Sequence, residues 1–227
     1  MNIFKTLGQK PWLEDANPAL PLNTVPEVDT NAAASIVLRF IMAIVSVLFF
    51  LFIITFLSRS QYPDFQALAG QPWQPFTDAS RLWLNTGFLA CASLAMQFGL
   101  RGARQTRINH AVFGICTAAF FSVLFLLAQL DLWQHLQAMG FYVNSNPANS
   151  YFYVLTALHG LHLMGGLIVL SNVAFRVWYD EAPEALAAPL KLCTTYWHIL
   201  LGVWLVLFAL LTSTPETINA LAAMCGF

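Results

Sequence analysis

Five long apolar runs dominate this sequence of 227 residues. A helix needs roughly 17 to 25 residues to cross the hydrocarbon core of a bilayer, and each run reaches that length: Ser35–Leu57, Leu82–Leu100, Ala111–Leu130, Tyr151–Val177 and Thr194–Leu211. Only 9% of the residues are charged, whereas soluble domains carry about a quarter. The sequence therefore predicts an all-α, polytopic membrane bundle of five transmembrane helices.

The prolines lie outside these runs, and Pro189, for example, precedes the last one. Proline removes a backbone donor and clashes inside a helix, so this distribution predicts five uninterrupted helices. Four prolines are spaced between Pro11 and Thr30, which is typical of an extended arm. We therefore expect an amino-terminal arm over residues 1–34, a membrane domain over 35–213 and a tail over 214–227.

The basic residues predict an orientation, because Lys and Arg accumulate on the cytoplasmic side of short loops. The Arg101–Arg107 link carries three arginines, whereas the Asp131–Ser150 loop carries no Lys or Arg. We therefore predict a cytoplasmic amino terminus and, after five spans, a carboxyl terminus on the opposite side. Ten basic and eleven acidic residues leave no broad basic face, so we expect no nucleic-acid partner.

Small residues recur every four positions on the second and third runs. In lipid, such stripes let two helix backbones approach closely. The link between these runs is short, which favours antiparallel neighbours. We predict that the two helices pack through these stripes, which are Gly87, Cys91, Ala95 and Gly99 on one helix and Gly114, Ala118 and Ser122 on the other.

Three histidines lie in the fourth and fifth runs, where a polar group is costly unless it finds a partner. His159 and His162 share one helical face because they are three residues apart. Imidazole is a common metal ligand, but no membrane carboxylate is present to orient these rings. We expect no catalytic, cofactor-binding or metal residue here, and we interpret six residues as a structural polar cluster or lipid contact: His159, His162, Tyr196, Trp197, His198 and Trp204.

Other chemistry finds little support in the sequence. The four cysteines are scattered without metal-binding spacing. Acidic residues are absent from the depth of the runs, and a proton-coupled transporter would be expected to carry some. The alternative from a different class is a free-standing membrane haem or metal protein that uses His159, His162 and His198.

Several segments carry a family pattern in order along the chain. Residues 151–166 read Tyr-Phe-Tyr-Val-Leu-Thr-Ala-Leu-His-Gly-Leu-His-Leu-Met-Gly-Gly. Together with five shorter segments, this run resembles the cytochrome c oxidase subunit III family, where a Thr-Gly-x-His-Gly-x-His segment opens a late helix. The shorter segments are Arg39–Phe50, which ends Val-Leu-Phe-Phe, Leu84-Asn85-Thr86, Gln129–Trp133, Tyr196-Trp197-His198 and Val203-Trp204-Leu205.

This resemblance implies a non-catalytic subunit III of a haem-copper terminal oxidase. Such a subunit carries no haem or copper, packs on the catalytic subunit I with subunit II in the same complex, binds phospholipid, and supports sustained turnover and proton uptake. It would lie in a bacterial inner membrane with its carboxyl terminus in the periplasm. An accessory chain of a quinol oxidase or nitric oxide reductase is the alternative within this group.

The sequence also departs from the family pattern. The family commonly has seven helices, and this chain resembles the five-helix bacterial members, so a lipid cleft walled by the first two helices does not carry over. Many members place a glutamate before the Val-Leu-Phe-Phe stretch, where this chain has Ser46. Many also place an aspartate three residues after the last-helix histidine, where this chain has Leu201. Roles tied to those two carboxylates do not transfer.

Overall fold

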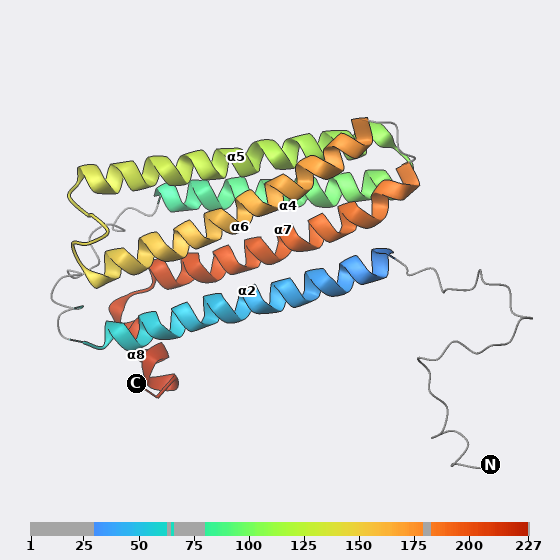
Figure 1. The fold of residues 1–227 in the computed structure, drawn as a ribbon. Helices are drawn as coiled ribbons and strands as arrows, with labels where there is room; N and C mark the ends of the chain where they lie inside the picture. Colours follow the sequence, from blue (N-terminus) through green and yellow to red (C-terminus); the bar gives the residue numbers. More distant parts are fainter. Residues whose placement is uncertain (1–29, 63–64, 66–79, 179–182, 227) are drawn as a thin grey trace, which may run out of the picture.

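The computed structural model describes residues 30–62, 65, 80–178 and 183–226. Over these residues the chain is all-helical, as predicted, with five long helices side by side and a short one at the carboxyl end (Figure 1). The helices are α2 (Thr30–Ser60), α4 (Ser80–Arg104), α5 (Ile108–Ala138), α6 (Pro147–Trp178), α7 (Pro183–Thr212) and α8 (Pro215–Met224).

Four of the long helices are long and apolar enough to cross a membrane. Within the described part of the chain these are segments of α2, α5, α6 and α7, namely Ala32–Ser60, Ile108–Ala138, Pro147–Phe175 and Leu186–Thr212. The fifth long helix, α4, has 25 residues, but it is less apolar than the others. The observed helices therefore agree with a membrane bundle, while the count of five spans stays a prediction.

The polar side chains of α4 explain its lower apolarity, because several of them face other helices rather than the outside. Asn85, Thr86 and Ser93 are all buried. In Figure 1, α4 lies between α5 and α7, and both helices contact it extensively. Its polar groups are therefore placed where protein partners, and not lipid, can satisfy them.

The helices α4 and α5 pack so closely that their backbones touch. A Cβ atom built on Gly99 would lie 3.3 Å from the Cα of Gly114, and one built on Gly114 would lie 2.8 Å from the carbonyl oxygen of Ala95. Nearer the start of α4, Gly87 and Cys91 are exposed. The seam therefore uses only the Ala95–Gly99 half of the stripe on α4, which corrects the expectation that all four positions take part.

The last long helix begins earlier than the apolar run that predicted it. It starts at Pro183 and includes Pro189, which contradicts the prediction that every proline lies outside the helices. Proline is tolerated within membrane helices because neighbouring groups satisfy the freed backbone. The carbonyl that loses its donor belongs to Ala185, four residues before Pro189 and in the first turn of α7.

Both ends differ in extent from the expected domains. Most of the arm, residues 1–29, lies outside the described residues, and residues 30–34 already belong to α2. The expected tail contains the helix α8, which is capped by the Thr214 hydroxyl accepting from the backbone N–H of Thr217 at 3.4 Å. Ala222 of α8 packs in one cluster with Phe56 of α2. The side of the membrane on which each end lies stays a prediction.

Candidate functional site

His159 of α6 lies fully buried inside a cage of aromatic rings. Its ring centroid is 6.5 Å from Phe49 of α2, 5.6 Å from Phe125 of α5 and 5.2 Å from Trp204 of α7. Neither ring nitrogen has a hydrogen-bond partner among the described residues. The imidazole is therefore held by packing from three other helices.

His162 lies about one turn farther along α6 and is half-buried. Its Nδ1 atom is 2.7 Å from the carbonyl oxygen of Leu158, and its ring centroid is 5.6 Å from that of Phe49. A carbonyl oxygen only accepts hydrogen bonds, so Nδ1 carries the proton and donates. His162 is thus anchored to its own helix and packs against α2.

Tyr196 and Trp197 join α7 to two other helices. The Tyr196 hydroxyl donates to the carbonyl oxygen of His162 at 2.7 Å. Gly166 leaves room for this ring, because a Cβ at Gly166 would lie 2.7 Å from Cε1 of Tyr196. The indole Nε1–H of Trp197 donates to the Ser122 hydroxyl of α5 at 3.0 Å. Ser122 of the small-residue stripe on α5 and motif residues of α6 therefore meet α7 at this point.

Trp204 lies two turns farther along α7 and is fully buried. Its Nε1–H donates to the hydroxyl of Thr86 on α4 at 3.0 Å. Its ring also meets Phe125 edge to face, with centroids 4.8 Å apart. Trp204 therefore joins α4 to α7 and forms one wall of the cage around His159.

His198 makes its contacts on another side of α7. Its Nε2 atom is 3.2 Å from Oε1 of Gln97, and its Nδ1 atom is 2.5 Å from the Ser93 hydroxyl. An amide oxygen only accepts, so Nε2 donates and a neutral ring accepts from Ser93 at Nδ1. Among the described residues, no hydrogen bond or ring contact joins His198 to His159 or His162. The structure thus separates His198 from the other five predicted residues.

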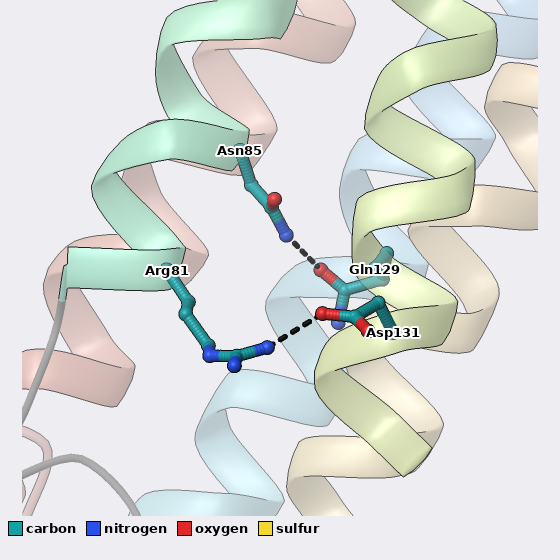
Figure 2. A network of polar contacts seen from close by, with 4 residues as sticks. All are labelled: Arg81, Asn85, Gln129 and Asp131. Atoms are coloured by element: carbon teal, nitrogen blue, oxygen red, sulfur yellow. Dashed lines mark hydrogen bonds and ion pairs between the residues drawn. The ribbon is translucent and has the colours of Figure 1, made fainter. Parts of the chain in front are cut away.

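Two polar pairs between α4 and α5 lie outside the residues singled out from the sequence. Figure 2 shows Asn85 donating to Oε1 of Gln129 at 3.0 Å, beside the ion pair between Arg81 and Asp131. Asn85 and Gln129 both fall in segments that resemble the family. A polar residue in an apolar run must find a partner. The presence of one such residue on each of two neighbouring helices could therefore have predicted the Asn85–Gln129 pair.

The arrangement offers little for metal chemistry. Within the described ranges, no three His, Cys, Asp or Glu side chains come together in a group that could hold a metal ion. Each of the three histidines instead packs in rings or bonds protein oxygens. The four cysteines are free thiols. What the three histidines have in common is contact with other helices, through ring packing for His159 and His162 and through hydrogen bonds for His198.

These features define a class of protein, a membrane helical bundle whose interior polar groups bind one another across the helices. A family model described as cytochrome c oxidase subunit III matches residues 25–213, which is most of the chain. The chain therefore belongs to the cytochrome c oxidase subunit III family. This confirms the resemblance drawn from the sequence motifs.

Curated proteins give the same family. The chain is 30% identical over 166 residues to a probable cytochrome c oxidase subunit 3 of Nocardia farcinica, covering 70% of this chain and 76% of that protein. It is 34% identical over 134 residues to cytochrome c oxidase subunit 3 of Synechocystis, covering 56% and 54%. It is also 26% identical over 130 residues to cytochrome bo(3) ubiquinol oxidase subunit 3 of Buchnera aphidicola, covering 57% and 63%.

Proposed function

We propose that this chain is the non-catalytic subunit III of a haem-copper terminal oxidase in a bacterial inner membrane. It packs there on the catalytic subunit I, with subunit II in the same complex. The observation that carries this proposal is the family match over residues 25–213. The His159 cage supports a structural role, because the imidazole most deeply placed in the bundle is enclosed by Phe49, Phe125 and Trp204.

We further propose that α4 crosses the membrane as the fifth span. Its 25 residues are enough for a hydrocarbon core of about 30 Å at 1.5 Å per residue. Its low apolarity is offset by internal bonds, since Asn85 pairs with Gln129, Thr86 accepts from Trp204, and Ser93 bonds His198. A helix whose polar groups are satisfied by protein can lie in a membrane at small cost.

The proposed orientation places the amino end of α2 in the cytoplasm and α8 in the periplasm. At one end of the bundle, Figure 1 brings together the start of α2, the α4–α5 link and the start of α7. That end carries Arg101, Arg104, Arg107 and Lys191. Basic residues of this density are typical of the cytoplasmic side.

In this role the chain binds phospholipid and supports sustained turnover and proton uptake by its neighbour. A bundle with apolar outer faces can seal and stabilise a catalytic subunit without doing chemistry itself. We assign no cofactor and no catalytic residue to this chain. Its contribution is to the assembly and its lipid surroundings.

Purification of the tagged full-length chain from its native membrane tests the proposal. We expect a haem-bearing subunit I and a subunit II to co-purify, as identified by mass spectrometry. After separation from them, this chain should show no haem absorbance. Haem or stoichiometric metal on the separated chain would instead support the free-standing haem or metal protein that uses His159, His162 and His198.

The relative from Buchnera aphidicola favours a second candidate, an accessory chain of a quinol oxidase. The relatives from Nocardia farcinica and Synechocystis are named as cytochrome c oxidase subunits. Assaying the purified complex with reduced cytochrome c and with ubiquinol separates the two. We expect oxygen consumption with cytochrome c, and oxidation of ubiquinol alone would favour the second candidate.

A further inference from the structure

An apolar groove of about 400 Å³ separates α2 from α6 and α7 near the amino end of α2. Its walls include Val37 and Ile41 of α2, Gly165 and Val169 of α6, and Leu192 of α7. A volume of this size lies within the range of ligand pockets in proteins. The apolar walls suit a hydrocarbon chain rather than a polar molecule.

The groove exists because side chains are missing from its floor. Gly165 contributes no side chain, and a Cβ built there would meet nothing within 4 Å. Gly166 beside it is covered by the Tyr196 ring. The α2 helix therefore stands away from α6 at this level, and the gap between them is lined by hydrocarbon.

A second pocket of about 270 Å³ adjoins the groove and is cationic. The two share Leu38 and Leu192, so they are continuous along the α2–α7 boundary. Arg39 and Lys191 line this pocket from α2 and α7, together with Thr195. Neither cation forms an ion pair with another described residue. The pocket therefore presents two positive charges next to an apolar channel.

The position of Arg39 along α2 matches the headgroup level of a bilayer. Arg39 and Arg59 are twenty residues apart on this helix, which corresponds to about 30 Å at 1.5 Å per residue. That length equals the thickness of a typical hydrocarbon core. With Arg59 at one interface, Arg39 lies at the other, where lipid phosphates are found.

We propose that this composite site binds one anionic phospholipid, with an acyl chain in the groove between α2, α6 and α7 and the headgroup at Arg39 and Lys191. This rests on the proposed phospholipid binding and assigns it a location, a charge preference and residues. Two cations offset the charge of an anionic headgroup better than that of a zwitterionic one. A free phosphate would gain nothing from the apolar groove, so the groove favours a lipid.

The charge preference is tested with the purified complex in detergent, titrated with phosphatidylglycerol or with phosphatidylcholine of the same chain length. We expect tighter binding of phosphatidylglycerol. The Arg39→Gln and Lys191→Gln variants should each weaken it by about fivefold, the equivalent of one cation near a lipid surface. Arg101→Gln serves as the matched control, because this basic residue is in the last turn of α4, which ends at the same end of the bundle (Figure 1), and is outside the pocket.

The groove is tested by filling it. A leucine side chain at position 165 has room to enter the groove, so Gly165→Leu should remove bound phosphatidylglycerol without unfolding the chain. Gly202→Leu is the control, since a Cβ at Gly202 also meets nothing within 4 Å and Gly202 lies outside the groove. Native mass spectrometry of both complexes reports the lipid retained.

The outcomes separate the site from the proposed function. Equal phosphatidylglycerol binding in wild type, Arg39→Gln and Gly165→Leu would overturn the site, and a lack of preference over phosphatidylcholine would overturn its charge selectivity. If subunits I and II still co-purified in either case, the oxidase assignment would stand. A wild-type chain that purified without oxidase subunits would refute the proposed function, whatever its lipid content.

Discussion

Two helix contacts in this bundle differ in how close the backbones come. At the α4–α5 seam a Cβ built on Gly102 would lie 2.8 Å from the backbone nitrogen of Ala111, so no side chain separates the two helices. Between α2 and α6 lies an apolar groove lined by Ile41 and Val169. At the α4–α5 seam, small residues on both helices face each other, so the backbones come close. At the groove, Gly165 of α6 faces larger side chains of α2, so the two helices stay apart.

This difference shows what holds membrane helices together. Lipid is as apolar as leucine, so association depends on close packing and polar contacts rather than on burial from water. The α4–α5 seam has both, since Gly99 meets Gly114 and Asn85 bonds Gln129. The groove beside α2 has neither close backbone packing nor polar contacts, and the acyl chain of a lipid can fill it. The seam is therefore expected to be the more sensitive to substitution.

Gly114→Leu should have the largest effect. The added side chain would meet the backbone nitrogen of Gly99 and the carbonyl oxygen of Ala95, which cannot move aside as a flexible side chain could. We expect a loss of at least about 3 kcal/mol, the upper end of overpacking costs. Unfolding of the purified chain in mixed detergent micelles measures it.

Gly87→Leu on α4 is the matched control for this substitution. A Cβ at Gly87 meets nothing within 4 Å, so stability should change by less than about 0.5 kcal/mol. Equal stability losses for the two leucine variants would mean that the seam is not the tight contact described above.

His159→Ala should have the next largest effect. The imidazole has no hydrogen bond to lose among described residues, so the cost is the cavity left between Phe125 and Trp204. We expect about 2 kcal/mol, the lower end of large-to-alanine costs, because lipid rather than water is the reference solvent. Mixed-micelle unfolding measures it, and haem absorbance of the complex should be unchanged. A loss of haem would contradict the packing role.

The helical repeat explains which parts of the fold and of the candidate site could be predicted from the sequence. The apolar runs predict the helices because span length and apolarity are local properties. The prediction that all four stripe positions on α4 pack against α5 is only partly correct. A step of four residues turns the helix about 40° farther than one full turn. Over the steps from Gly99 back to Gly87 the stripe therefore rotates off the buried face. That face instead alternates steps of three and four, through Asn85, Leu89, Ala92, Met96 and Gly99.

The same geometry divides the candidate site. A two-residue step turns a helix by about 200°, so Tyr196 faces α6 while His198 faces α4. Trp197 and Trp204 are seven residues apart and share the buried face. Which helices lie opposite those faces depends on the packing of the whole bundle. The partners Ser93 and Gln97 could not be chosen from the sequence for that reason.

His198→Ala should have a smaller effect than His159→Ala. It removes hydrogen bonds to Ser93 and Gln97, but at an exposed position it leaves no cavity inside the bundle. We expect about 1 kcal/mol or less, as found for hydrogen bonds between membrane helices. Thermal unfolding of the complex measures it. A cost above that of His159→Ala would place the main structural histidine on the α4 side of α7.

The ion pair of Arg81 with Asp131 should contribute least to the seam. Their side chains are 47% and 69% exposed, so solvent screens the pair. We expect a coupling of about 0.5 kcal/mol from a double-mutant cycle with Arg81→Gln and Asp131→Asn, falling as salt is added. The neighbouring Asn85–Gln129 bond is buried and should keep its coupling in salt, when measured with Asn85→Leu and Gln129→Leu. A coupling of the ion pair that exceeded that of Asn85–Gln129 and did not fall with salt would mean that water has less access to the pair than these exposures imply. The polar end of the seam, rather than its glycines, would then control how α4 and α5 associate.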